Sequence, residues 1–233
     1  MEENFSKLLG ERVRQVQAEL AQASEGRYPP PRLIAVTKTH PPEMILPLLD
    51  CGVSAVGENR VQEILEKRAA LERKFRIHLI GRLQSNKVKY IIEDVCLIHS
   101  LDRLSLAAEI DRQAQRHGRM MDVLVQVSPA GEPQKGGMAP ETVRSFLEEA
   151  RRMPGLRVRG LMAVMPQSDD QAYLSGLFAG MRQLFDRLRE EAMEGVEMEE
   201  LSMGMSGDYR LAARHGATMV RVGSALFGQR SYR

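Results

Sequence analysis

Cysteine and paired histidines are scarce in this sequence, and their scarcity excludes several classes of site. The chain of 233 residues has two cysteines, Cys51 and Cys96, which form no CxxC motif. Neither a zinc site nor a disulfide framework is indicated, and we expect two buried thiols in a reducing compartment. The five histidines are scattered, and none lies four residues from another. Metal catalysis has no support from this pattern.

A strong charge imbalance and long apolar runs are also missing. The 33 basic and 31 acidic residues leave a net charge of +2, so the chain has no electrostatic footprint for nucleic acid. No run approaches the ~18 apolar residues that a membrane span needs. Residues 1–20 are charged and lack the apolar region and cleavage site of a signal peptide. We therefore expect a cytoplasmic protein that binds neither nucleic acid nor a membrane.

Short apolar runs alternate with longer segments of helical period, which is typical of repeated βα units. An amphipathic segment at residues 3–24 predicts a helix before the first strand. Strands are predicted at residues 33–37, 54–57, 76–80, 96–99, 122–127, 158–162, 200–203 and 218–222. Helices are predicted between them at residues 43–49, 60–73, 86–93, 103–117, 140–153, 170–194 and 207–215.

Eight such units can form either a closed barrel or an open doubly wound sheet. A GxGxxG turn after the first strand would favour the open sheet, whereas residues 37–41 are TKTHP. We therefore predict an α/β fold, a single (β/α)8 TIM barrel with an extra N-terminal helix, as one domain over residues 1–233. The glycine- and proline-rich residues 129–140 predict a mobile loop over one end of the barrel.

Lys38 stands at the end of the first predicted strand, where barrels of this kind build their active sites. Partial desolvation lowers the pKa of such an ammonium group, and the neutral amine can form a Schiff base. A strand-end lysine can also simply extend into water.

Two glycine–serine turns follow the last two strands, at Ser206–Gly207 and Gly223–Ser224. Their backbone N–H groups could hold a phosphate, although each turn alone would also suit a helix cap. Because strand 8 closes on strand 1, these turns should face Lys38 across the barrel mouth.

A phosphorylated aldehyde or ketone would fit between the lysine and the turns. Two classes remain open: a class I aldolase-like enzyme acting on a sugar phosphate, or a protein that holds pyridoxal 5'-phosphate (PLP). Arg221 lies two residues before Gly223, hence on the same face, and could meet the pyridine nitrogen of PLP. A cofactor-free aldolase would need a carboxylate near Lys38, and Glu58 is the only nearby candidate.

With these features the sequence resembles the pyridoxal phosphate homeostasis proteins, whose barrel is similar to the N-terminal domain of alanine racemases. The resemblance covers nearly the whole chain, and the order of its motifs makes it specific. The motifs are AVTK (35–38), GENRVQE (57–63), HLIGRLQSNK (78–87), KGG (135–137), GLM (160–162), LSMGMS (201–206) and VRVG (220–223).

The resemblance implies that Lys38 carries PLP as a Schiff base, that Arg221 contacts the ring nitrogen and that Asn59 lies beside the cofactor. It also implies a phosphate site made of Ser206, Gly207, Gly223 and Ser224. Asn59 would equally suit a helix N-cap. Lys135 is implied as a second PLP contact.

We expect a PLP-binding protein that acts in intracellular PLP (vitamin B6) homeostasis as a carrier or buffer, without efficient turnover. An arginine practically never accepts a proton, so Arg221 would leave the ring nitrogen unprotonated and weaken the electron sink. Alanine racemases add a tyrosine base in trans and a second, β-rich domain. Few residues follow Gly228 here, so we expect no such domain, and Tyr209 is the only tyrosine near a predicted site loop.

The expected partners are PLP and apo PLP-dependent enzymes that receive it, and we expect a monomer. The alternative is a weak PLP-dependent amino-acid racemase or a related enzyme that uses Lys38 alone as its base. A second acid or base across the cofactor from Lys38 would favour this alternative, and the sequence shows no convincing one.

Overall fold

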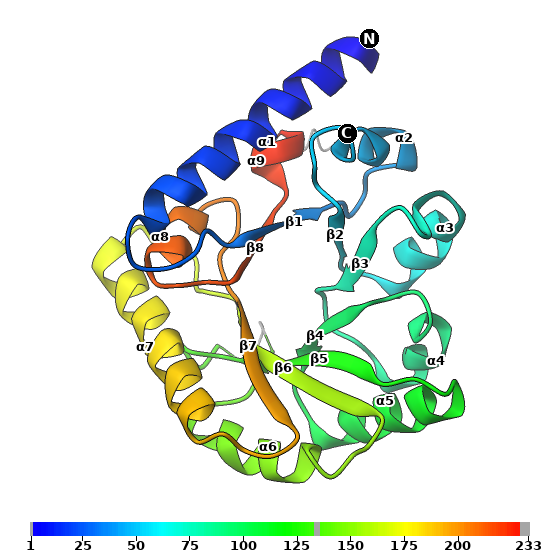
Figure 1. Ribbon diagram of the computed structural model, residues 1–233, viewed down its shortest axis with the longest axis vertical. Helices are drawn as coiled ribbons and strands as arrows, with labels where there is room; N and C mark the ends of the chain where they lie inside the picture. Colours follow the sequence, from blue (N-terminus) through cyan, green and yellow to red (C-terminus); the bar gives the residue numbers. More distant parts are fainter. Residues whose placement is uncertain (1, 133–135, 229–233) are drawn as a thin grey trace.

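The computed structural model describes residues 2–132 and 136–228. Eight parallel strands close into a barrel in chain order, with β8 paired to β1 (Figure 1). The predicted (β/α)8 barrel is therefore confirmed. The strands are β1 (Arg32–Val36), β2 (Ala55–Glu58), β3 (Arg76–Leu79), β4 (Leu97–Leu101), β5 (Met121–Val127), β6 (Leu156–Ala163), β7 (Val196–Ser202) and β8 (Met219–Val222).

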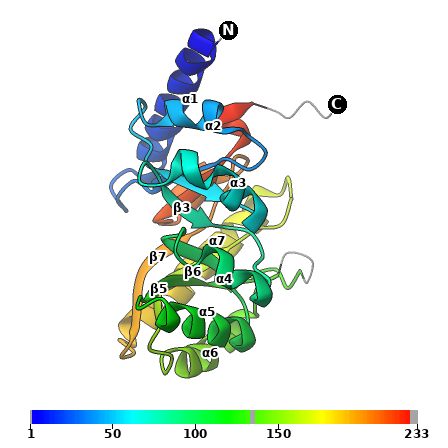
Figure 2. The same ribbon diagram turned by 90° about the vertical axis from the view of Figure 1, so that its right-hand side faces the viewer.

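Helices surround the barrel on its outer side (Figures 1 and 2). The α-helices are α1 (Glu2–Ser24), α2 (Pro42–Ile45), α3 (Val61–Leu71), α4 (Val88–Ile91), α5 (Leu104–Arg116), α6 (Val143–Ala150), α7 (Gln171–Glu190), α8 (Tyr209–Arg214) and α9 (Ser224–Phe227). Within the part of the chain that the structure describes, 3-10 turns are found at η1 (Leu46–Leu48), η2 (Ser85–Lys87) and η4 (Pro140–Thr142).

The extra N-terminal helix is present and packs along α8 and α9 (Figure 1). Its buried residues Leu9, Val13, Val16 and Leu20 recur every three or four positions, so they form one apolar stripe. This stripe explains why a segment with many charged and polar residues folds against the barrel.

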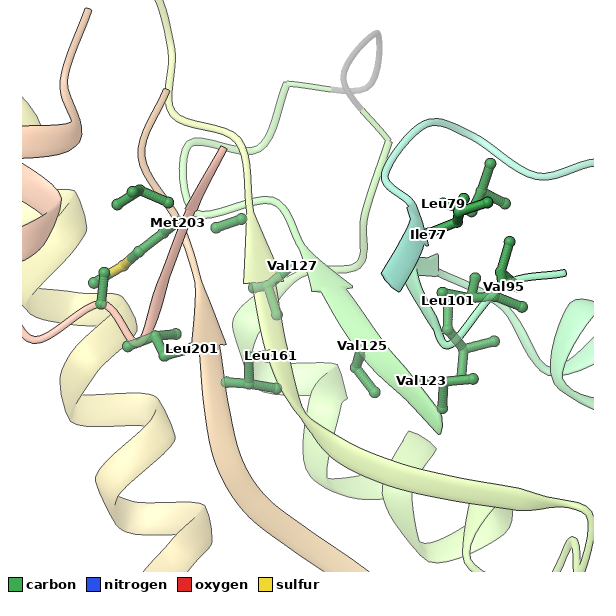
Figure 3. Close-up of a cluster of buried hydrophobic side chains, with 14 of the residues drawn as sticks. Ile77, Leu79, Val95, Leu101, Val123, Val125, Val127, Leu161, Leu201 and Met203 are labelled. Carbon is green, nitrogen blue, oxygen red and sulfur yellow. The ribbon is translucent and has the colours of Figure 1, made fainter. Parts of the chain in front are cut away.

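Side chains of the strands alternate between the barrel interior and the surrounding helices. A small inner cluster consists of Ile34, Leu97, Leu124, Met162 and Met219. The outward-facing residues join the main core beneath the helices, and Figure 3 shows part of it, including Val123, Val125, Val127, Leu161 and Leu201. By this alternation Ile34 and Val36 face inward, and Lys38 continues the inward series at the barrel mouth.

β6 and β7 begin earlier than the sequence predicts, and they are visibly long in Figure 1. The acidic residues at the start of β7 are not typical of a buried strand, so the sequence pattern did not predict a strand there. In the structure Arg159 on β6 pairs with Glu197 at 2.8 Å and also with Glu199. Gly160 adopts φ +146°, and a Cβ there would collide with the carbonyl oxygen of Glu200. The register between the two strands shifts at this glycine.

Both cysteines are free and half-buried, so the prediction of two buried thiols was wrong in its degree of burial. Burial still raises the pKa of each thiol. No group of three metal-ligating side chains occurs among the described residues. Within the same residues, no helix is both long and apolar enough to cross a membrane. Lys135 lies outside the residues that the structure describes.

Candidate functional site

A cavity of about 660 Å³ opens at the carboxyl ends of the strands. Its size is typical of a site for a small molecule. All seven predicted site residues line it: Lys38, Asn59, Ser206, Gly207, Arg221, Gly223 and Ser224. The structure therefore brings together residues from the ends of β1, β2, β7 and β8 that are up to 186 positions apart in the chain (224 minus 38).

The two glycine–serine turns are joined by one hydroxyl group. Ser206 Oγ accepts hydrogen bonds from the backbone N–H of Gly223 at 3.1 Å and of Ala225 at 3.3 Å. The backbone amides of Gly207 and Ser224 make no hydrogen bond to another described residue, so they remain available to an anion. A Cβ at Gly207 would meet nothing within 4 Å, whereas one at Gly223 would press on Val36 at 3.3 Å. The turns thus form a backbone-lined pocket end that can accept a phosphate.

Arg221 reaches into the cavity from β8 and is only 4% exposed. Its guanidinium group donates to Ser202 Oγ at 2.6 Å and to the carbonyl oxygen of Ala163 at 2.8 Å. Burial lowers the pKa of Arg221 to about 10, while the charge of Asp208 acts in the opposite direction. The group therefore stays cationic at neutral pH. Among the described residues it makes no ion pair, so it presents a buried positive charge to the cavity.

Two buried histidines lie behind Arg221. His78 Nδ1 is 2.9 Å from His99 Nε2, and His99 Nδ1 is 3.0 Å from Ser202 Oγ. Burial lowers the pKa of His78 to about 3 and holds that of His99 well below its usual value. Both are neutral at physiological pH. Nothing in the sequence pattern marked them as part of a site, although both positions fall inside predicted strands.

A second polar cluster lies on the outer side of β1, behind Lys38. Glu58 is fully buried, and its Oε1 accepts from Thr37 Oγ1 at 2.6 Å and from Lys67 Nζ at 2.8 Å. Lys67 also donates to the carbonyl oxygen of Thr37 at 2.8 Å. On the other side of Lys38, the amide of Thr39 donates to Glu63 Oε2 at 2.5 Å. Both neighbours of Lys38 are therefore anchored to the layer between barrel and helices.

This arrangement corrects the proposed role of Glu58 as an aldolase carboxylate. Its side chain is directed away from the cavity and is engaged by Lys67. Burial raises the pKa of Glu58, and the hydrogen bonds from Lys67 and Thr37 lower it. A cofactor-free aldolase loses its only candidate carboxylate.

Asn59 lines the cavity, but it does not cap the following helix. Arg60 occupies the N-cap position of α3, so the helix-cap interpretation of Asn59 was wrong. The backbone after β3 passes directly over Asn59, because a Cβ at Gly81 would collide with the Asn59 carbonyl oxygen. This close approach fixes the Asn59 backbone at the cavity wall.

Two further side chains define the surroundings of the site. His40 lines the cavity and stacks on Phe227 with ring centroids 4.2 Å apart, a contact that the sequence analysis did not anticipate. Tyr209 is almost buried, and its hydroxyl donates to Glu19 of α1. Tyr209, the first residue of α8, therefore contacts α1 and points its hydroxyl away from the cavity.

Comparisons with known proteins agree with this geometry. The family model described as "Alanine racemase, N-terminal domain" matches residues 12–231. A protein of Aquifex aeolicus named "Pyridoxal phosphate homeostasis protein" is 44% identical over 202 residues, which cover 86% of this chain and 88% of that protein. A Pseudomonas aeruginosa protein of the same name is 37% identical over 228 residues, with 96% of each chain covered.

Solved structures give the same result. PipY of Synechococcus elongatus PCC7942, solved with PLP bound, superposes with a TM-score of 0.83 at 36% identity, covering 94% of this chain and all of that one. Alanine racemase from Bartonella henselae has a TM-score of 0.75 at 13% identity and covers 96% of this chain and 60% of that one. The racemase supports the fold alone.

Proposed function

The chain belongs to the alanine racemase N-terminal domain family, and within it to the pyridoxal phosphate homeostasis proteins, and we propose that it binds PLP as a carrier or buffer in vitamin B6 homeostasis. One observation carries the proposal: a single cavity unites a lysine, a buried arginine and two hydroxyl-bridged glycine turns. We further propose that residues 1–233 act as one PLP-binding domain in the cytoplasm, as a monomer that passes PLP to apo-enzymes.

Each lining residue has a distinct part in this proposal. Lys38 holds the cofactor covalently, and Arg221 donates a hydrogen bond to the ring nitrogen. Asn59 lies beside the ring. The phosphate is held by Ser206, Gly207, Gly223 and Ser224. Bound PLP supplies an electrophilic carbon and an electron-accepting ring.

A carrier is favoured over a fast enzyme because Arg221 can donate a hydrogen bond to the ring nitrogen but does not protonate it. Tyr209 is turned toward Glu19, so it cannot serve as a second base. The relatives are named as homeostasis proteins, while the fold is shared with racemases. One observation keeps a weak racemase as the second candidate, namely that His40 lines the cavity together with Lys38.

The covalent role of Lys38 is tested by adding PLP to the purified protein and reducing it with borohydride. We expect a visible absorption band and a mass increase on the peptide that contains Lys38 in the wild type, and neither in Lys38→Ala. Lys74→Ala, at an exposed lysine in the turn after α3, is the matched control and should label as the wild type does. An unchanged band and label in Lys38→Ala would remove Lys38 from this role.

Turnover separates the carrier from the racemase. The PLP-loaded protein is incubated with L- and D-amino acids, and the enantiomers are quantified by chiral chromatography. We expect no multiple turnovers. Turnovers that disappear in His40→Gln as well as in Lys38→Ala would instead establish a two-base enzyme.

The serine that bridges the two turns should contribute to cofactor affinity. Ser206→Ala removes the acceptor for two backbone amides, and we expect PLP to bind about tenfold more weakly, or about 1.4 kcal/mol. Spectroscopic titration with PLP measures the effect. Ser145→Ala, on the exposed face of α6, should leave the affinity unchanged.

A further inference from the structure

We propose that His78, His99 and Ser202 are positioning residues that form a buried hydrogen-bond chain and fix both the orientation and the charge state of Arg221 at the cavity floor. The part of this inference that concerns PLP rests on the proposed function. The part that concerns Arg221 itself applies to the protein without any ligand.

The chain crosses the barrel interior from β3 to β8. It runs from His78 on β3 to His99 on β4, then to Ser202 on β7 and Arg221 on β8, with distances of 2.9, 3.0 and 2.6 Å. All four residues are less than 5% exposed. Because these groups are shielded from water, solvent does not compete for their hydrogen bonds, and the hydrogen-bond chain keeps one arrangement.

The donors in this chain can be assigned because an arginine has no acceptor. Ser202 Oγ accepts from Arg221, so its own proton is free to go to His99 Nδ1. His99 must then carry its proton on Nε2 and donate it to His78 Nδ1. In the reverse assignment both Arg221 and His99 would donate to Ser202, and the buried hydroxyl proton would have no partner among the described residues.

The surroundings keep both rings neutral. The charged groups that act on the pair are Arg32 of β1, Arg76 of β3 and Arg221 of β8, and all are cations. A proton added to His78 would place two N–H groups face to face across the 2.9 Å contact, and a proton added to His99 would direct an N–H group at the hydroxyl proton of Ser202 across the 3.0 Å contact. The hydrogen-bond chain therefore offers Arg221 a neutral acceptor, and Arg221 is the one charged member of this chain.

The result is a guanidinium group that cannot turn away from the cavity. Ser202 holds one terminal nitrogen and the Ala163 carbonyl holds the other, so the rest of the group stays aimed at a ligand. This gives a role to His78 and Ser202, which lie inside two of the sequence motifs yet do not line the cavity.

The chain is tested with four variants. Ser202→Ala removes the acceptor of Arg221, and His99→Leu removes the partner of Ser202. His99→Asn keeps an acceptor close to the position of Nδ1 and so should rescue the contact with Ser202. Ser100→Ala is the matched control, because Ser100 is equally buried, adjacent to His99 and outside the chain.

Two readouts separate this inference from the proposed function. In the protein without ligand, nitrogen NMR should show His78 and His99 both protonated on Nε2 and a slowly exchanging Arg221 guanidinium signal. Ser202→Ala and His99→Leu should lose that slow exchange, and His99→Asn and Ser100→Ala should keep it. With PLP, we expect the first two variants to bind about tenfold more weakly and to shift the pH midpoint of the visible band.

The outcomes are distinct. A wild type that shows the NMR pattern but binds no PLP would overturn the proposed function, whereas the proposed hydrogen-bond chain would remain supported. Folded Ser202→Ala and His99→Leu proteins with wild-type exchange, affinity and band midpoint would overturn the chain. The same conclusion follows if Ser100→Ala changes these properties as strongly as they do.

Discussion

Lys67→Met is expected to lower the free energy of unfolding by about 3–5 kcal/mol, because it leaves the buried carboxylate of Glu58 without its cation. Glu58 is fully buried, and its second oxygen, Oε2, already has no hydrogen-bond partner. The lysine also holds the Thr37 carbonyl at 2.8 Å. Chemical denaturation at pH 7.5 measures the loss.

The effect of the unpaired Glu58 charge can be separated from the effect of lost packing by varying the pH and by a second substitution. Without Lys67, Glu58 can become neutral by taking up a proton, so the loss should be smaller at pH 5 than at pH 7.5. The double variant Lys67→Met with Glu58→Gln should recover much of the stability. Lys74→Met, at an exposed lysine, should stay within about 0.5 kcal/mol of the wild type. A loss that is equal at both pH values and in the double variant would contradict the explanation.

This cluster also bears on the function. Thr37 and Thr39 flank Lys38, and they are held by Glu58 with Lys67 and by Glu63 respectively. Thr39 adopts a φ of +67°, a conformation that a β-branched residue rarely takes without such support. The position of Lys38 at the barrel mouth thus depends on an ion pair that never contacts the cavity.

The residues that line the cavity could be predicted from the sequence, but the buried contacts that hold these residues in place could not. Lys38, Ser206 and Gly223 each follow directly after an apolar run, and in a barrel all such positions meet at one end. Arg221 could be assigned to the same face because side chains of a strand alternate. These inferences need only local pattern and barrel closure, and the cavity lining agrees with both.

No local sequence pattern indicates the contacts that lie behind the cavity. Glu58 and Lys67 are nine positions apart on a strand and the next helix, and His99 and Ser202 are 103 positions apart. A histidine inside an apolar run looks the same whether it is isolated or paired. The start of β7 was missed for a related reason, because the pairing of Glu197 with Arg159 of β6 appears only once the strands are adjacent.

The free energy of unfolding is expected to fall by about 2 kcal/mol between pH 7 and pH 5 through His78 alone. Its pKa is about 3 in the folded protein, because burial and the charges of Arg76 and Arg32 disfavour the imidazolium, against 6.5 in an unfolded chain. Below pH 6.5 the unfolded chain therefore binds a proton that the folded protein excludes. Stability is complete above pH 6.5 and is lost as the pH falls toward 3.

Other groups modify this window in known directions. His99 and His215 also have lowered pKa values, mainly through burial, so they add to the loss. The raised pKa of Glu58 acts in the opposite sense, because the folded protein takes up that proton more readily. Burial raises the pKa of Glu63, but the interactions with Thr39 and Lys67 together outweigh it and lower the pKa from 4.5, so Glu63 contributes only below this window.

Urea denaturation of the wild type and of His78→Gln from pH 7 to pH 5 isolates the histidine. Below pH 6.5 we expect the wild-type slope to exceed that of His78→Gln by about 1.4 kcal/mol per pH unit, since the glutamine binds no proton in either state. Equal slopes in the wild type and His78→Gln would mean that His78 is not held neutral by its burial. The same variant breaks the hydrogen-bond chain to Arg221 at its far end, so a shallower slope together with intact PLP affinity would confine the role of His78 to stability.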